Sequence, residues 1–416
     1  MPFFRPALLV LACLLAQPAL ADDLPSLGDS SSSIVSPEQE HQLGRAWLSI
    51  LRGQVRQLED PLLKDYVERS VYRLAESSQL NDRRLEFILL ASPQLNAFAA
   101  PGGIIGVNGG LFLHAQTESE YASVMAHELA HLSQRHFARG LEAQKRMQIP
   151  LMAAMLAGVI AAAAGGGDVG MAAIASTQAA AIQEQRRFSR QNEQEADRIG
   201  LVNLSKAGFD PRAMPSMFER LMRQYRYDRM PPEFLLTHPV SESRIADTRN
   251  RAEQYSDGQG VVDSLYYQLI RARLQLTFED TSGLALKRFR SELADNPQQE
   301  SARYGLVLAL IRGNQLEEAR SQLEPLLKKT PKSIIYNLAA VDLEISSSQF
   351  VQATRRVEGL LQSYPNNFPL LSAKYEIQLK QNDIAGAEKT INLLLKQRPN
   401  DPDIWFEVAE VRGLSN

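Results

Sequence analysis

Two histidines, His127 and His131, lie four residues apart in the stretch SVMAHELAHLSQRH. In an α-helix, residues at this spacing lie on one face, one turn apart, so both imidazoles can reach the same metal ion. Glu128 follows His127 and therefore lies beside that face, where a carboxylate can touch a metal-bound water without ligating the metal. The pattern H-E-x-x-H is typical of zinc hydrolases. The structural alternative is two histidines that only form hydrogen bonds on a helix.

The other histidines have weaker patterns. His136 lies five residues after His131 and nine after His127. At about 100° per residue in a continuous helix, it is about 500° round from His131 and about 180° round from His127. We therefore predict that His136 is a surface histidine. His41 and His114 have no supporting context and are interpreted as structural or surface residues.

A catalytic zinc site needs a third protein ligand and an open position for water. The candidates are the remaining histidines and the carboxylates of QNEQEADRIG, which contains Glu193, Glu195 and Asp197. Glu193 and Asp197 share one helical face, whereas Glu195 points about 200° away from Glu193. This face therefore presents one ligand and a second carboxylate. A carboxylate in that place can hydrogen-bond a ligating imidazole and fix its orientation.

The elements that position these residues follow from capping and turn signals. Ser36, Pro37 and Gln39 predict a helix start with a capping box, and the helical pattern continues to about Ser78. Helical pattern returns at about Glu118 and carries the two histidines.

Between these helices the sequence predicts a small sheet. Residues 85–91 read LEFILLA, and residues 96–112 contain two short apolar runs that Pro101-Gly102-Gly103 separates. We interpret the strand after Pro101 as the sheet edge, on which a substrate peptide adds as a further strand through main-chain hydrogen bonds. A purely structural edge is the alternative.

Two Ala-rich apolar runs follow, at residues 150–164 and 169–182, with glycines between them. Each is shorter than the ~20 residues that cross a bilayer. The pattern favours a helical hairpin packed on the domain. A mobile lid, or a surface that contacts membrane or substrate, is the alternative.

The C-terminal part repeats with a period of 34 residues, which is typical of helix–turn–helix tetratricopeptide repeats. In each repeat a small residue precedes an apolar residue by four positions and a proline by twelve. The three columns are Ala285, Ala319, Ala353 and Ala387; Phe289, Leu323, Val357 and Ile391; and Pro297, Pro331, Pro365 and Pro399. Residues 402–412 predict a capping helix. Such arrays stack into a curved solenoid whose groove binds peptides or proteins, although a structural appendage is the alternative.

The N-terminus has the pattern of an export signal. Arg5 precedes an apolar run over residues 7–16, and Ala19-Leu20-Ala21 forms a cleavage site, which predicts a mature chain starting at Asp22. The only cysteine, Cys13, lies inside this signal, so the mature chain has no thiol for metal binding or catalysis. The net charge of −3, from 45 basic and 48 acidic residues, gives no electrostatic case for nucleic-acid binding.

The motifs HELAH and EQEAD together resemble the HtpX-like family of zinc metallopeptidases, which carries H-E-x-x-H and then E-x-x-x-D on a later helix. NAFAAPGG, before the first motif, and THPVSESRI, after the second, also match that family. The resemblance implies an α+β fold: a mainly helical, zincin-type domain with a small β-sheet, here residues 22–261. An all-α repeat solenoid over residues 262–416 follows.

By this resemblance, His127, His131 and Glu193 hold one zinc ion per chain, and Glu128 is the general base. Asp197 either orients an imidazole or donates a proton. Two further residues come from THPVSESRI. Arg244 steadies the oxyanion or braces the site, and His238 either occupies the open zinc position at rest or forms a structural hydrogen bond.

The resemblance also implies a periplasmic endopeptidase, peripheral to the outer membrane rather than integral. Its substrates would be misfolded or stalled outer-membrane β-barrel proteins, and its repeats would bind the barrel assembly machinery. Two alternatives remain open at this point. One is a scaffold or chaperone with gated proteolysis, and the other is a metal hydrolase that acts on cell-wall peptides.

Overall fold

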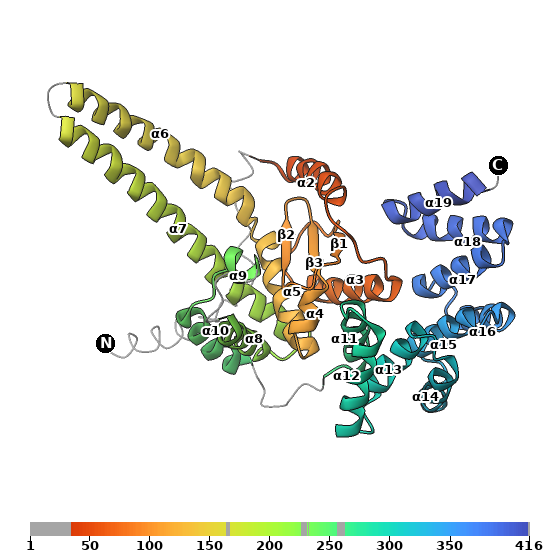
Figure 1. The fold of residues 1–416 in the computed structure, drawn as a ribbon. Helices are drawn as coiled ribbons and strands as arrows, with labels where there is room; N and C mark the ends of the chain where they lie inside the picture. Colours follow the sequence, from red (N-terminus) through yellow and green to blue (C-terminus); the bar gives the residue numbers. More distant parts are fainter. Residues whose placement is uncertain (1–34, 164–166, 226–230, 232, 256–262, 415–416) are drawn as a thin grey trace, which may run out of the picture.

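The computed structural model describes residues 35–163, 167–225, 231, 233–255 and 263–414. The predicted export signal with Cys13, and the predicted boundary between residues 261 and 262, lie outside these ranges. A helical domain around a small sheet is followed by an array of paired helices (Figure 1). The predicted fold class, α+β followed by an all-α repeat solenoid, is confirmed.

The sheet has three strands: β1 (Glu86–Leu90), β2 (Ala97–Ala100) and β3 (Ile104–Asn108). Their order is β1-β3-β2, with β1 parallel and β2 antiparallel to β3. The strand after Pro101 is therefore the central strand, and the prediction that it forms the edge is wrong. Gly102 and Gly103, with φ of 77° and 80°, turn the chain back so that β3 pairs with β2. β1 takes the other side of β3, so β1 and β2 are the two outer strands.

The helical region that was predicted to run to about Ser78 is two helices, α2 (Pro37–Arg52) and α3 (Pro61–Glu76). The capping box of Ser36 and Gln39 is present at the start of α2. Asp60 caps α3 by accepting hydrogen bonds from the N–H groups of Leu62 and Leu63, at 2.9 and 3.1 Å. The cap at Asp60 starts a new helix, so the apolar periodicity is interrupted between α2 and α3.

The histidines lie on α5 (Glu118–Ser133), which follows the short α4 (Gly110–His114). A capping box of Thr117 and Glu120 begins α5. Most of α5 is buried, which is why the helix places its side chains rigidly.

The predicted hairpin consists of α6 (His136–Ala163) and α7 (Gly167–Lys206). It is helical, but its distal half projects from the domain instead of packing on it (Figure 1). The second Ala-rich run and the segment that contains Glu193 belong to one helix, α7, which packs against both α5 and α6. In the part of the chain that the structure describes, every helix is too short or too polar to cross a bilayer.

Three further helices complete this domain: α8 (Ala213–Tyr225), α9 (Glu233–Thr237) and α10 (Glu242–Tyr255). α8 packs against α5, and α10 packs against α7 and α8. Through α9 and the residues that follow it, the chain returns to the C-terminal half of α5.

The repeat array is built from nine helices within the described residues: α11 (Leu265–Thr277), α12 (Ser282–Asp295), α13 (Glu300–Arg312), α14 (Leu316–Lys329), α15 (Ile334–Ser346), α16 (Phe350–Ser363), α17 (Phe368–Lys380), α18 (Ile384–Gln397) and α19 (Pro402–Leu414). The predicted alanine and apolar columns lie on α12, α14, α16 and α18 and are buried. Each predicted proline follows one of these helices by two residues. Asn314, Ser348 and Asn382 have positive φ at the turns and keep the repeat period.

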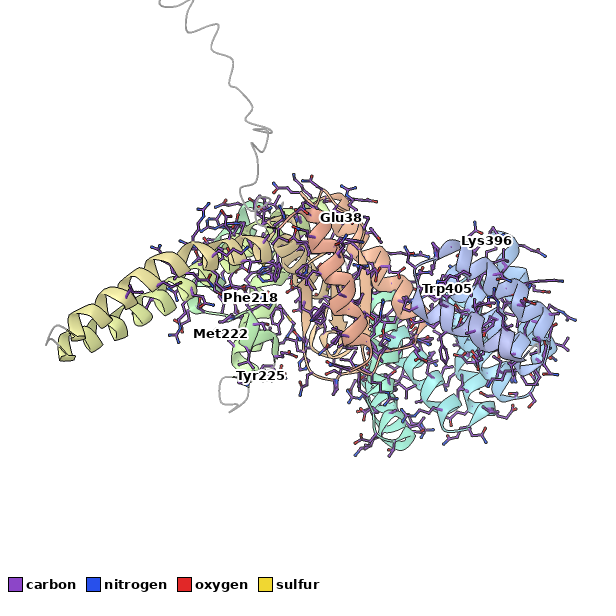
Figure 2. The ribbon with its side chains drawn as sticks, turned by 90° about the horizontal axis from the view of Figure 1, so that it is seen from above. Glu38, Phe218, Met222, Tyr225, Lys396 and Trp405 are labelled. Atoms are coloured by element: carbon purple, nitrogen blue, oxygen red, sulfur yellow. The ribbon has the colours of Figure 1, made fainter. Side chains whose placement is uncertain are left out.

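The array curves back against the first domain, and α17 packs on α3. Arg398 donates to both carboxylate oxygens of Glu68, at 2.6 and 2.5 Å, and Lys64 pairs with Asp401 at 2.6 Å. The array and the hairpin of α6 and α7 lie at opposite ends of the molecule (Figure 2).

Candidate metal centre

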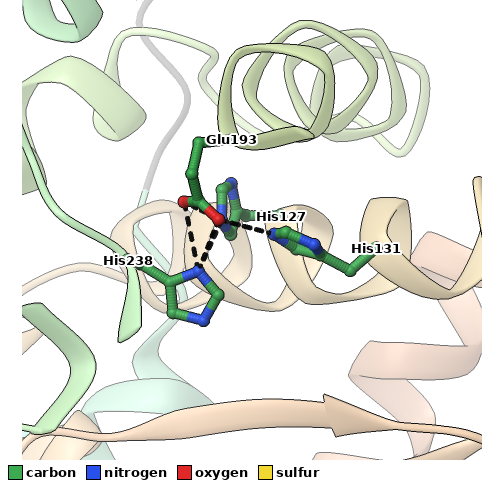
Figure 3. Close-up of side chains that lie close together, drawn as sticks. All are labelled: His127, His131, Glu193 and His238. Carbon is green, nitrogen blue, oxygen red and sulfur yellow. Dashed lines mark hydrogen bonds and ion pairs between the residues drawn. The ribbon is translucent and has the colours of Figure 1, made fainter. Parts of the chain in front are cut away.

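Four side chains from three places in the chain converge at one point (Figure 3). α5 carries His127 and His131, α7 carries Glu193, and His238 follows α9. One ligand atom from each residue lies within 4.8 Å of all the others. Glu193, which is sixty-two residues after His131 in sequence, therefore reaches the two histidines as the sequence predicted.

The spacing of these atoms fits a divalent cation. Nε2 of His127 lies 3.1 Å from Nε2 of His131, 3.4 Å from Nδ1 of His238 and 3.4 Å from Oε2 of Glu193. Nδ1 of His238 lies 3.1 Å from the same oxygen, and Nε2 of His131 lies 3.5 Å from Oε1 of Glu193. Ligand atoms at zinc–nitrogen and zinc–oxygen distances of about 2.0–2.1 Å in a tetrahedron stand about 3.3 Å apart. Four of these separations, those among Nε2 of His127, Nε2 of His131, Nδ1 of His238 and Oε2 of Glu193, are close to the edge length of such a tetrahedron.

The electrostatics favour a cation as well. Burial opposes the charge of Glu193, but contacts with His127 and His238 outweigh it and hold the pKa of this carboxyl well below its usual range. Burial and the neighbouring His127 lower the pKa of His131, which keeps it neutral. Although burial opposes it, contacts with Asp197 and Glu193 raise the pKa of His127 to about 10. A cation that takes Nε2 of His127 replaces a proton there.

Glu128 lies beside the cluster and not in it. Its Oε2 accepts a hydrogen bond of 2.9 Å from the N–H of Ala99 in β2, and its Oε1 lies 3.5 Å from Nε2 of His238. Among the residues that the structure describes, none donates a hydrogen bond to this buried Oε1. Burial raises the pKa of Glu128, while His238 and His127 act against that rise. The group has the placement and the proton affinity of a general base.

Asp197 lies behind His127. Its Oδ1 is 3.0 Å from Nδ1 of His127, without the alignment of a full hydrogen bond. Arg244 binds both oxygens of Asp197, at 2.7 Å each, and its Nη1 is 3.1 Å from Oε2 of Glu193. The same Nη1 donates to the carbonyl of Pro239 at 2.8 Å, next to His238. Arg244 thus joins Glu193 and Asp197 to the segment that carries His238.

The prediction that His136 is a surface histidine is wrong. α5 ends at Ser133, and Arg135 has a φ of 50°, so the helix is not continuous and the angular argument does not apply. His136 is buried, and its Nδ1 lies 2.8 Å from Nδ1 of His131. Glu195, which points away from Glu193, lies 3.3 Å from Nε2 of His136. Glycine and proline are absent from the break, so no local signal would have revealed it.

A cleft of about 1030 Å³ opens onto the site. Glu128, His131 and His238 line its inner end, and the edge strand β2 lines one side. Trp47 of α2 also lines the cleft, and its ring lies edge-on to Phe98 of β2 with ring centroids 5.7 Å apart. The cleft therefore combines an edge strand, whose Ala99 N–H is bound to Glu128, with apolar side chains. Edge strands can bind an extended peptide by adding it to the sheet.

Comparisons with known proteins agree with this geometry. Residues 61–252 match the peptidase family M48, and residues 283–341 and 344–405 match a tetratricopeptide repeat family. A putative beta-barrel assembly-enhancing protease of Vibrio cholerae is 40% identical over 352 residues, which are 82% of this chain and 72% of the relative. The beta-barrel assembly-enhancing protease of Escherichia coli K12 is 39% identical over 331 residues, 79% of this chain and 68% of the relative. This chain belongs to the M48 family, among the beta-barrel assembly-enhancing proteases.

The likeness to M48 proteins extends to more distant relatives. A mitochondrial metalloendopeptidase, OMA1 of Arabidopsis thaliana, is 30% identical over 187 residues, which are 45% of this chain and 36% of that protein. As a member of the M48 family, this chain is a metalloprotease, and the predicted family and repeat class are confirmed. The M48 match falls inside the predicted domain of residues 22–261, and both repeat matches fall inside residues 262–416.

Proposed function

We propose that this M48 protein is a zinc-dependent endopeptidase of the periplasm that degrades misfolded or stalled outer-membrane proteins and assists their assembly. The observation that carries the proposal is the convergence of His127, His131 and Glu193 next to the unpaired oxygen of Glu128. Two imidazoles and one carboxylate are the ligand set of catalytic zinc sites in proteases. A zinc ion held by these three residues would supply Lewis-acid chemistry, acidifying the attacking water and polarising the scissile carbonyl.

The chain's own residues supply the proton transfers. Glu128 takes a proton from the attacking water through Oε1 and delivers it to the leaving amine. The N–H of Ala99 holds Oε2 of Glu128 in place, so the base is fixed relative to β2. A peptide that adds to the edge of β2 then lies with its backbone next to Oε1. The wall of Trp47 and Phe98 favours chains that expose large apolar side chains, as unfolded β-barrel proteins do.

For Asp197, we propose orientation of His127 and not proton donation. Asp197 is fully buried and both its oxygens are bound by Arg244, so it is held as an anion facing Nδ1 of His127. For Arg244 we propose a bracing role, because its donors are directed to Asp197, Glu193 and Pro239. These contacts take four of the five N–H groups of Arg244, which favours bracing over contact with an oxyanion.

His238 is the fourth side chain of the cluster and lies against His127 and Glu193, where catalysis needs an open position for water. We propose that this arrangement is a closed resting state that substrate must open. The segment is anchored: Asn96 donates to Glu233 at 3.0 Å, and the ring of His238 lies tilted against Phe234 with centroids 5.0 Å apart. A gate of this kind also suits the alternative in which the protein is mainly a scaffold with controlled proteolysis.

The repeats support the proposal that the barrel assembly machinery is the partner. Solenoids of this class bind proteins, and the relatives are named for enhancing β-barrel assembly. We further propose residues 22–261 and 262–416 as the two domains, with the export signal cleaved after Ala21.

The experiment that tests the function compares the mature protein with its Glu128→Gln variant. We expect each to contain one equivalent of zinc by elemental analysis, and only the wild type to cleave casein. Activity should fall at least about 10³-fold in the variant, because the general base is lost.

Two other outcomes would change the conclusion. Cleavage of peptidoglycan fragments without cleavage of casein would favour the cell-wall hydrolase. A Glu128→Gln strain that retains every cellular role would favour the scaffold.

A further inference from the structure

The second nitrogen of each metal-site imidazole on α5 faces a different partner. Nδ1 of His127 faces Asp197, whereas Nδ1 of His131 faces His136 at 2.8 Å. Continuing outward, Nε2 of His136 lies 3.3 Å from Oε2 of Glu195, and Arg139 donates to the same oxygen at 2.9 Å. A chain of polar contacts thus leads from His131 to the surface, and its members play no part in the mechanism described above.

We propose that His136 and Glu195 are positioning residues that hold the ring of His131 at the metal centre. The inference rests on the proposed metal centre and adds residues that neither its motif nor its ligand set includes.

The direction of each hydrogen bond in this chain is determined by the metal site. Nε2 of His131 faces the cluster and needs a lone pair to bind a cation. A neutral imidazole then carries its proton on Nδ1, so His131 donates and Nδ1 of His136 accepts. The proton of His136 must therefore be on Nε2, where it is donated to Glu195. Every contact has one donor and one acceptor, and the terminal carboxylate is balanced by Arg139.

The fold explains why His131 is reached through a relay. Glu193 and Asp197 lie on the face of α7 toward α5, and Glu195 lies on the side toward α6. Glu195 therefore cannot contact His131 directly in the way that Asp197 contacts His127. His136, at the first position of α6, fills the space between Glu195 and His131. Within five residues, α7 consequently provides the ligand Glu193, the support of His127 by Asp197, and the support of His131 by Glu195 through His136.

The backbone is adapted to this contact. Arg135 has a left-handed φ of 50°, which is rare for a residue with a side chain. Its guanidinium pairs with Glu40 of α2 at 2.9 Å and donates to the carbonyl of Val35 at 2.7 Å. These contacts with a segment ninety-five residues away keep the turn that brings His136 back beneath His131.

The test measures zinc affinity by competition with a chelator in the full mature chain. For His136→Ala we expect affinity about 10- to 100-fold weaker, as for other residues that orient a metal-bound histidine. His136→Asn places an amide oxygen near the position of Nδ1 and should retain affinity within about threefold. Glu195→Ala should be weaker than wild type, and adding it to His136→Ala should cause no further loss, because Glu195 acts through His136.

Two controls separate positioning from general damage. Gln134 lies in the same turn, and its side chain donates hydrogen bonds to Gln79 and Ser133. Gln134→Ala should therefore bind zinc as the wild type does. The visible absorption of the Co²⁺-substituted protein reports coordination geometry, and it should change in His136→Ala while the unfolding temperature of the metal-free protein does not.

The outcomes distinguish the two levels of the proposal. Wild-type zinc affinity and an unchanged Co²⁺ spectrum in His136→Ala would overturn the positioning role while leaving the metal centre intact. A wild-type protein that binds no zinc would overturn the metal centre itself, and the positioning role with it. Equal losses in His136→Asn and His136→Ala would also contradict the role, because an acceptor at this position would then have no effect.

Discussion

His238 is the residue whose side chain has to move before the proposed mechanism can begin. Its Nδ1 lies 3.1 Å from Glu193 and 3.4 Å from Nε2 of His127, and its Nε2 faces Glu128. One imidazole therefore contacts the ligands and the base together. The loss of this one side chain would free the fourth position and the base at the same time.

We predict that His238→Ala raises basal cleavage of casein about tenfold. A tenfold change corresponds to the removal of a conformational cost of ~1.4 kcal/mol in opening the site. The measurement is the initial rate of the mature protein at fixed zinc. As a control, Glu128→Gln combined with His238→Ala should be inactive, which shows that the added cleavage uses the same site. Unchanged or lower activity in the single variant would mean that His238 supports the site instead of blocking it.

At the scale of elements, α2 and β2 both contribute residues to the lining of the cleft. Trp47 and Ile50 are both exposed apolar residues of α2, at 39% and 62% relative exposure. Trp47 lines the cleft and contacts Phe98 on β2, whereas Ile50 lies outside it. The two positions therefore form a matched pair for testing the apolar wall.

We predict that Trp47→Ala raises KM about tenfold for a peptide with a large aromatic side chain near the scissile bond, with a smaller change in kcat. Loss of an apolar contact for one buried side chain costs about 1.5 kcal/mol. For the same peptide with alanine at that position, the KM values of the wild type and Trp47→Ala should differ less. Ile50→Ala should behave as wild type towards both peptides, and an equal loss in Ile50→Ala would assign the effect to helix stability.

At the scale of the whole molecule, the end of the repeat array is tied to α3, which packs on the helix that carries His127 and His131. Arg398 binds Glu68 through two nitrogens and lies over the ring of Phe368 at 3.9 Å. Both charged side chains are about four-fifths buried, so solvent screens the pair less than at the surface.

We predict a coupling energy of about 1 kcal/mol between Arg398 and Glu68, at the upper end of values for exposed ion pairs. The measurement is a double-mutant cycle of Arg398→Ala and Glu68→Ala by thermal unfolding. Coupling should decrease with added salt. A coupling energy of zero at low salt would show that packing of α17 on α3, and not this ion pair, joins the repeat array to the first domain.

Asp342 of α15 gives a prediction on pH. Burial raises its pKa from 3.8 to about 6, while Arg273 acts against the rise. Folding therefore favours the neutral carboxyl. The contribution of Asp342 to stability is fully present below its pKa in the unfolded chain. It is lost as the pH rises through its pKa in the folded protein. Asp342→Asn should raise the melting temperature by about 3 °C at pH ~7.5.

The effect of Asp342→Asn should shrink at pH ~4.5, because the wild-type carboxyl is then largely protonated in the folded state. Unfolding scans at both values of pH measure this change. A pH-independent difference between the two proteins would show that Asp342 has an ordinary pKa.

The sequence by itself determined the features that depend on neighbours along the chain. Residues four apart on a helix share a face whatever surrounds them, so the pairing of His127 with His131 and of Glu193 with Asp197 was readable directly. A repeated buried column, such as the alanines of α12, α14, α16 and α18, is also local, since each repeat packs on the next.

Only the tertiary structure decided where helices break, which strand is the edge and which carboxylates meet which histidines. Arg135 leaves the helix because Glu40 and Val35 bind it from a distant segment, and this turn buries His136 against His131. β3 is central because β1, which precedes both other strands in sequence, pairs with its free side. Such contacts join residues far apart in the chain, and local periodicity carries no record of them.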